Sequence, residues 1–223
     1  MLRDKLVELK RHLLEDAALV EDMIAKSIRG LSEKNELLLL EVVNTEEPKA
    51  NVYDREIDEM CVELIAQYEP RARDLRMVIM IIKMNKDLER IADHAVNVCE
   101  SALYLISKPN LPPLDDLKLM GENAVHMLKD SINAFVNENV HLANAVLERD
   151  NIVDTAGDTI LKELTDLMHG QKEVIPRALH VMRIAHNLER IADLATNISE
   201  EVVYIVEGRD IKHHHVEDNP TNP

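Results

Sequence analysis

The sequence has few of the residues from which β-structures are built. Its 223 residues include four tyrosines, one phenylalanine, no tryptophan, five glycines and eight prolines. Sandwiches and barrels need aromatic and β-branched strands separated by frequent turns. The chain is instead rich in Leu, Ala, Met, Glu and Lys, which favour helices. We therefore expect an all-α fold.

Cysteines and long apolar runs are also scarce. Cys61 and Cys99 cannot build a disulfide framework in a chain of this length, and their apolar helical surroundings predict two small core residues. The longest apolar runs, 77–82 and 202–206, are far shorter than the roughly 18 residues that span a bilayer. The first residues show no signal-peptide pattern. The sequence thus predicts a cytoplasmic protein without direct membrane insertion.

Basic residues are fewer than acidic ones. The chain has 26 Lys and Arg but 42 Asp and Glu, which gives a net charge of −16. Nucleic-acid binding needs a basic footprint that displaces counterions, and none is present. Nucleic acid is therefore not an expected partner. The negative field suits metal cations or a basic patch on another protein.

Apolar spacings of three and four residues predict helices that fall into two similar halves. The expected helices cover residues 2–29, 37–43, 45–67, 71–105, 114–139, 141–148, 150–169 and 176–207. Gly30 is the expected stop of the first helix, and Ser32 the expected N-cap of the second. We expect a three-helix bundle with an elbow in residues 1–108 and another in 114–212. A proline-rich linker (109–113) joins them, and a polar tail (213–223) follows.

An internal repeat supports this division. Residues 89–100 and 189–200 are identical at eight of twelve positions, at a spacing of 100 residues. Glu89, Asp93 and Asn97 lie at i, i+4 and i+8, on one helix face. The second copy has the same row. Acidic pairs at this spacing repel each other by a few tenths of a kcal/mol, in the absence of a compensating partner. Carboxylate rows of this kind suit hard cations.

The preceding helix of each half carries a D-x-x-x-D pair, at 54–58 and at 150–154. If consecutive helices pack antiparallel, these pairs can face the repeated rows, although the sequence does not fix the register. The competing interpretation is an ordinary solvated face, held by nearby Arg90 and Arg190. His94 and His186 have Leu194 and Lys86 as counterparts, which argues against a general ligand role for either histidine.

These segments resemble the PhoU family. The resemblance rests on residues 54–58, 70–76 and 88–93 of the first half, and on 150–154, 188–193 and 204–210 of the second. It implies two tandem, pseudo-symmetric three-helix bundles. It also implies surface motifs that in some relatives hold multinuclear iron or zinc clusters; Mg or Mn is not excluded. The implied metal ligands are Asp54, Asp58, Glu89, Asp93, Asp150, Asp154, Glu189 and Asp193. Ala92 and Ala192 stand where relatives often have Gly, which should only stiffen the helix.

The resemblance further implies a non-enzymatic, homodimeric regulator of phosphate uptake and phosphate-starvation signalling. Its expected partners are the ATPase of a phosphate ABC transporter and a sensor histidine kinase, whose response it would dampen at high phosphate. Two alternatives remain. One is a metal-free helical adaptor, and the other is a carboxylate-bridged di-metal enzyme. The enzyme would need two E-x-x-H motifs, and the sequence has one, Glu138 to His141.

Overall fold

The computed structural model describes residues 1–111 and 115–207, and within them every regular element is helical. The elements are α1 (Leu2–Ser32), α2 (Glu36–Glu41), the π-helical turn η1 (Val42–Glu46), α3 (Glu47–Tyr68), α4 (Arg73–Ile106), α5 (Asp115–Asn137), α6 (Val140–Gly170), the 3₁₀ turn η2 (Lys172–Val174) and α7 (Ile175–Glu207). The all-α prediction is confirmed.

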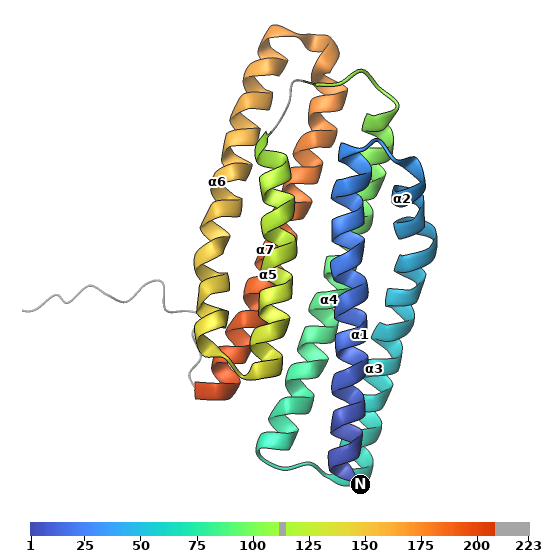
Figure 1. Cartoon of the computed structure of the whole chain (residues 1–223), viewed down its shortest axis with the longest axis vertical. Helices are drawn as coiled ribbons and strands as arrows, with labels where there is room; N and C mark the ends of the chain where they lie inside the picture. The colour runs from blue at the N-terminus through green and yellow to red at the C-terminus, as the bar shows by residue number, and fades with distance from the viewer. Residues whose placement is uncertain (112–114, 208–223) are drawn as a thin grey trace, which may run out of the picture.

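Two three-helix bundles stand side by side (Figure 1). The first consists of α1, α4 and the run from α2 through η1 to α3, and the second of α5, α6 and α7. The bundles meet along α4 and α7, and α1 also packs against α5. This is the pseudo-symmetric arrangement that the sequence predicted.

Equivalent turns follow the first helix of each bundle. Lys34 and Glu138 both have a positive φ, of 53° and 50°. The next residues, Asn35 and Asn139, cap α2 and α6 by accepting a hydrogen bond from a backbone N–H three residues on. The predicted cap at Ser32 was therefore wrong, because Ser32 still belongs to α1. In both turns, the residue with positive φ and the capping asparagine are separated from their equivalents by 104 residues.

Gly30 does not end α1, contrary to the prediction. The helix continues to Ser32, and Gly30 is buried beneath α2. A Cβ atom at this position would lie 2.5 Å from Leu39 Cδ2. Gly30 therefore serves the close approach of α2 to α1 rather than the end of the helix.

The break predicted near residue 149 is also absent. Helix α6 runs without interruption where two helices, 141–148 and 150–169, were expected. Its buried Val146 and Val153 are seven residues apart, so the apolar stripe crosses the junction in register. Arg149 extends from the middle of the helix to Asp130 on α5, with an Nη1–Oδ2 distance of 2.8 Å. In the first half the corresponding elbow is real, and η1 forms it.

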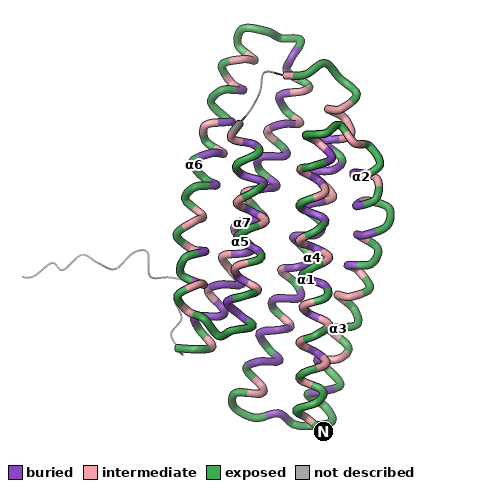
Figure 2. The backbone as a smooth tube through the Cα atoms, in the orientation of Figure 1, coloured by how far each residue is buried: buried purple, intermediate pink, exposed green. Residues whose placement is uncertain are grey.

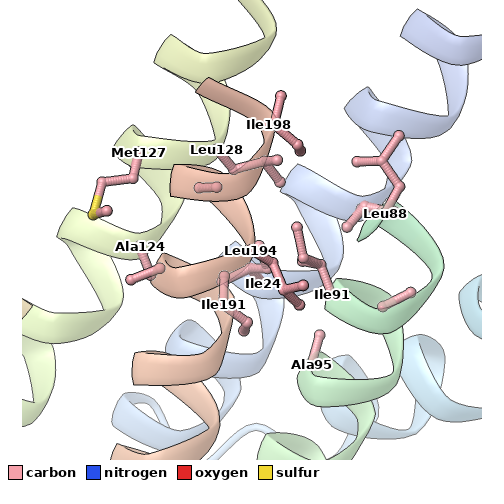
Figure 3. Close-up of a cluster of buried hydrophobic side chains, with 14 of the residues drawn as sticks. Ile24, Leu88, Ile91, Ala95, Ala124, Met127, Leu128, Ile191, Leu194 and Ile198 are labelled. Carbon is pink, nitrogen blue, oxygen red and sulfur yellow. The ribbon is translucent and has the colours of Figure 1, made fainter. Parts of the chain in front are cut away.

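The hydrophobic core continues from one bundle into the other. Buried positions line the inward face of each helix, while outward faces are exposed (Figure 2). Figure 3 shows Ile24 of α1, Ile91 of α4 and Leu194 of α7 meeting between the bundles. The isoleucines of the sequence repeat, Ile91 and Ile191, are both fully buried in this cluster. The repeat therefore supplies matching core contacts as well as acidic rows.

The predicted tail at 213–223 and the last residues of the predicted linker lie outside the described residues. None of the helices described is both long enough and apolar enough to cross a membrane.

Candidate functional site

The first acidic cluster lies where α3 packs against α4. Asp54 and Asp58 are one turn apart on α3, and Glu89 and Asp93 are one turn apart on α4. The side-chain amide of buried Asn85 on α4 donates to Oδ1 of Asp54 at 3.0 Å and to Oδ1 of Asp58 at 3.1 Å. The acidic pair of α3 therefore faces α4, as the antiparallel packing of consecutive helices predicted.

Lys86 supplies positive charge to this cluster. Its Nζ lies 2.8 Å from Asp54 Oδ1, 3.1 Å from Asp54 Oδ2 and 3.0 Å from Asp58 Oδ2. The hydrogen bond to Asp54 is the main reason why the pKa of Lys86 is raised. The pKa of Glu89 is raised too, first by burial and then by repulsion from Asp93 and Asp54.

Helix α1 brings a further acid toward the first cluster. The Asp16 side chain is only 2 % exposed, and its Oδ1 has no hydrogen-bond partner. Burial and the nearby charge of Asp54 raise the pKa of Asp16 to about 7. Met120 occupies the equivalent position of the second half by the 104-residue offset. A buried acid on α1 is thus a property of the first bundle.

The second acidic cluster lies between α6 and α7. It consists of Asp150 and Asp154 on α6 and of Glu189 and Asp193 on α7. Burial raises the pKa of Asp150 to about 6, with further contributions from its three acidic neighbours. Burial and the charge of Asp193 likewise raise the pKa of Asp154. Because Asp150 Oδ1 is buried without a hydrogen-bond partner, this cluster holds negative charge that is only partly balanced.

Among the residues that the structure describes, few cations balance the second cluster. Arg190 Nη1 lies 3.0 Å from Asp193 Oδ2, one turn away on the same helix. His186 Nδ1 lies 4.0 Å from Glu189 Oε2, also within α7. Neither contact involves the carboxylates of α6. The ordinary solvated-face interpretation, with Arg190 as the counter-charge, thus accounts for Asp193 but leaves Asp150 unexplained.

Within residues 1–111 and 115–207, no three His, Cys, Asp or Glu side chains are placed to hold one metal ion. Metal binding by the eight implied ligands therefore stays a prediction. The two clusters fit a cation to different degrees. The unpartnered oxygen of Asp150 and its mutually repelling neighbours suit a hard cation. In the first cluster the carboxylates of α3 already accept hydrogen bonds from Asn85 and Lys86.

Cys61 and Cys99 are buried and unpaired, which confirms the core interpretation. Burial raises the pKa of both thiols to about 12, so they are poor nucleophiles and poor metal ligands at neutral pH. His94 neither joins the acidic row nor lies free on the surface. Its Nδ1 is 2.8 Å from Asn187 Oδ1 across the seam between α4 and α7.

Sequence reasoning missed Asp16 and Asn85, and it identified Lys86 only as the counterpart of His186, not as a neighbour of the acids. Asn85 and Lys86 lie four and three residues before the repeat and have Ala185 and His186 as counterparts. A comparison of charge just upstream of the repeat would therefore have revealed them. Asp16 gave a weaker signal, as one acid beside the apolar stripe of α1, and its burial depends on packing against α3 and α4.

Two fused three-helix bundles, each with acidic pairs on adjacent helices, define a duplicated helical-bundle protein. The PhoU domain model matches the chain twice, over residues 13–102 and 117–202. The chain belongs to the PhoU family.

Similar proteins match over nearly the whole chain. A phosphate-specific transport system accessory protein PhoU homolog of Aquifex aeolicus is 34 % identical over 214 residues, covering 96 % of each chain. The PhoU accessory protein of Escherichia coli is 31 % identical over 209 residues, which cover 94 % of this chain and 86 % of that protein.

Solved structures agree with the fold. The crystal structure of PhoU from Pseudomonas aeruginosa is similar at a TM-score of 0.90 and 32 % identity, covering 94 % of this chain and 100 % of that one. The phosphate transport system regulatory protein PhoU from Streptococcus pneumoniae is similar at a TM-score of 0.87 and 30 % identity, covering 95 % and 99 %.

Proposed function

We propose that this chain is a non-enzymatic regulator of phosphate uptake and phosphate-starvation signalling. It acts in the cytoplasm as an adaptor between the ATPase of a phosphate ABC transporter and a sensor histidine kinase, and dampens the response when phosphate is plentiful. The observation that carries the proposal is the match to PhoU accessory and regulatory proteins over both bundles.

The physical properties of the molecule support an adaptor. Long helices held by one continuous core form rigid faces, and the net charge of −16 favours partners with basic patches. A homodimer would present each face twice and strengthen docking through multivalency.

The arrangement around Glu138 disfavours the di-metal enzyme. Glu138 and His141 form the single E-x-x-H motif, but Glu138 lies in the turn between α5 and α6 rather than on a bundle-facing helix. Both of its carboxylate oxygens accept hydrogen bonds from Arg73 Nη2, at 2.5 and 2.6 Å. Its carboxylate is thus engaged at the end of the bundle, away from both acidic clusters.

Deletion of the gene should raise transcription from phosphate-responsive promoters in phosphate-rich medium. The same cells carrying a tagged copy should yield the transporter ATPase and the kinase in a pull-down. Unchanged transcription together with no capture of either partner would overturn the adaptor proposal. Capture of the ATPase alone would restrict the role to control of the transporter.

We also propose that the second cluster binds a metal ion, with iron or zinc as the first candidates and Mg or Mn as alternatives. Asp150, Asp154, Glu189 and Asp193 would hold it. A bound cation would neutralise the carboxylates and offer coordination positions to phosphate oxygens or to acidic groups of a partner. The unpartnered oxygen of Asp150 is the observation that favours this proposal.

The test is elemental analysis of the purified full chain and of the Asp150→Asn, Asp193→Asn double variant. We expect the double variant to lose most of the bound metal while keeping its helical content by circular dichroism. The Glu163→Gln, Asp166→Asn variant is the matched control, since both residues are exposed acids further along α6. Equal metal in all three proteins would show that the metal is bound outside this cluster and overturn the proposed site. No metal in any of them would favour the metal-free adaptor.

A further inference from the structure

The four carboxylate oxygens of Asp54 and Asp58 are all engaged within the chain. Asn85 Nδ2 donates to Oδ1 of each aspartate. Lys86 Nζ contacts both oxygens of Asp54 and the remaining Oδ2 of Asp58. One ammonium group thus bridges two acids that lie one helical turn apart. That is the position that a bridging cation would take on such a pair.

The second half lacks both of these donors. At the 100-residue spacing of the repeat, Ala185 replaces Asn85 and His186 replaces Lys86. Ala185 has no side-chain donor, and His186 is directed along its own helix toward Glu189 rather than across to α6. The acids of the two halves match one for one, but the groups that neutralise them do not.

The consequence is visible on the first aspartate of each pair. Asp54 has an amide and an ammonium bound to its carboxylate. Its counterpart, Asp150, has a buried oxygen without a hydrogen-bond partner. The unpaired charge of the second cluster would therefore be stabilised by an external cation. In the first cluster, Lys86 already neutralises the aspartates.

We propose that Lys86 is the built-in cation of the first acidic cluster, so that this half is closed to metal ions and the pseudo-symmetric acidic clusters are functionally unequal. A metal ion entering the first cluster would have to displace an ammonium that is covalently attached and therefore present at high effective concentration. It would also have to replace the hydrogen bonds of Asn85. Lys86 thereby determines which half of the chain can bind a metal ion.

The experiment is a titration of metal-free full chain with Mn²⁺, followed by electron paramagnetic resonance of the free ion. The Lys86→Met variant should gain a Mn²⁺ site with at least tenfold higher affinity than any site the wild type has in this half. Asp54→Asn with Asp58→Asn should abolish the new site, and should leave wild-type binding unchanged within twofold. Lys86→Arg, which keeps the charge, should gain no site.

A reciprocal swap provides the matched control. His186→Lys places an ammonium in the second cluster and should weaken Mn²⁺ binding there at least tenfold, if the second half binds Mn²⁺ as proposed above. Absence of Mn²⁺ binding in the wild type would remove Mn from the candidate metals of the second cluster but leave the Lys86→Met result decisive. Circular dichroism checks that each variant is folded, and Lys86→Gln replaces the methionine variant if that one unfolds.

Two results would overturn the inference about Lys86. One is the loss of wild-type Mn²⁺ binding in the Asp54→Asn, Asp58→Asn variant. The other is a folded Lys86→Met or Lys86→Gln protein that gains no Mn²⁺ site. Because these readouts concern the first cluster alone, they are independent of the adaptor role and of the second metal site.

Discussion

At Asp16 the chain keeps a carboxyl group inside the first bundle, next to the apolar stripe of α1. Its neighbours on the buried face include Leu13, Ala17 and Val20. The ionised form is disfavoured by burial and by Asp54, so the folded protein binds a proton here more tightly than the unfolded chain does. The stability that this proton contributes is complete below the ordinary pKa of 3.8 and is lost as the pH rises through about 7.

The Asp16→Asn variant should therefore be more stable than the wild type at pH 8, by roughly 2–4 kcal/mol for a pKa shift of about three units. The difference should shrink toward pH 4, where the wild-type carboxyl is protonated in the folded state. Urea unfolding at a series of pH values measures both quantities. Glu15→Gln, at the exposed neighbouring position, is the control and should change stability by less than about 0.5 kcal/mol. A constant difference across this pH range would contradict the expected burial of the charge.

At the scale of elements, the π-helical turn η1 explains why the first bundle has an elbow and the second does not. It places Glu46 inside the bundle, where the residue is 5 % exposed. Lys26 of α1 forms ion pairs with Glu46, with Glu41 at 2.9 Å and with Asp22 at 2.8 Å. One lysine therefore ties the irregular turn to the first helix. A buried pair of this kind is costly to break, because the remaining charge is left unpaired.

The Lys26→Met variant should lose roughly 2–4 kcal/mol of stability, because Glu46 would remain buried without its cation. Adding Glu46→Met should restore much of that loss, since the second change removes the orphaned charge. Chemical unfolding of the two single variants and the double variant gives the coupling energy. Lys5→Met, which breaks an exposed pair with Glu8, should cost less than about 1 kcal/mol. Strictly additive losses would show that the ion pair does not stabilise η1.

At the scale of the whole molecule, the seam between α4 and α7 joins the bundles into one body. Ile91 and Ile191 are completely buried there. Polar contacts border the apolar seam. Lys83 Nζ pairs with Glu201 at 2.9 Å, and the rings of Tyr104 and His180 stack with centroids 3.9 Å apart. We therefore expect the two halves to unfold together, despite their separate sequence repeats.

The Ile191→Ala variant should lower the stability of the whole chain by roughly 2–4 kcal/mol, through lost burial and the cavity left behind. Hydrogen exchange followed by mass spectrometry should show equal loss of protection in α4 and in α7. Leu179→Ala serves as the control, since Leu179 is on the same helix but 54 % exposed. Loss of protection in α5 to α7 alone would show that the bundles are independent units.

Particular residues show which helix boundaries could be predicted from the sequence and which could not. The apolar stripes located most helices to within a few residues. Pro48 and Pro176 lie in the first turns of α3 and α7, where proline is favoured. Gly30 was misread because a helix-ending glycine and one that admits a neighbouring helix look alike in a sequence. The break near residue 149 was predicted because the polar residues Arg149 and Asp150 interrupt the apolar pattern. The apolar stripe nevertheless continues in register on both sides of them, so the helix is not broken there. Both errors concern contacts between helices.

The sequence by itself determined the all-α class, the duplication and the spacing of the eight acids along consecutive helices. Helical periodicity and the 100-residue repeat are local properties, so one chain displays them without its fold. Only the tertiary structure decided how those acids differ. Asp16, Asn85 and Lys86 reach the first cluster from α1 and α4, while the oxygen of Asp150 is buried without a partner in the second. The balance of charge at a site depends on distances between helices, which a linear pattern does not contain.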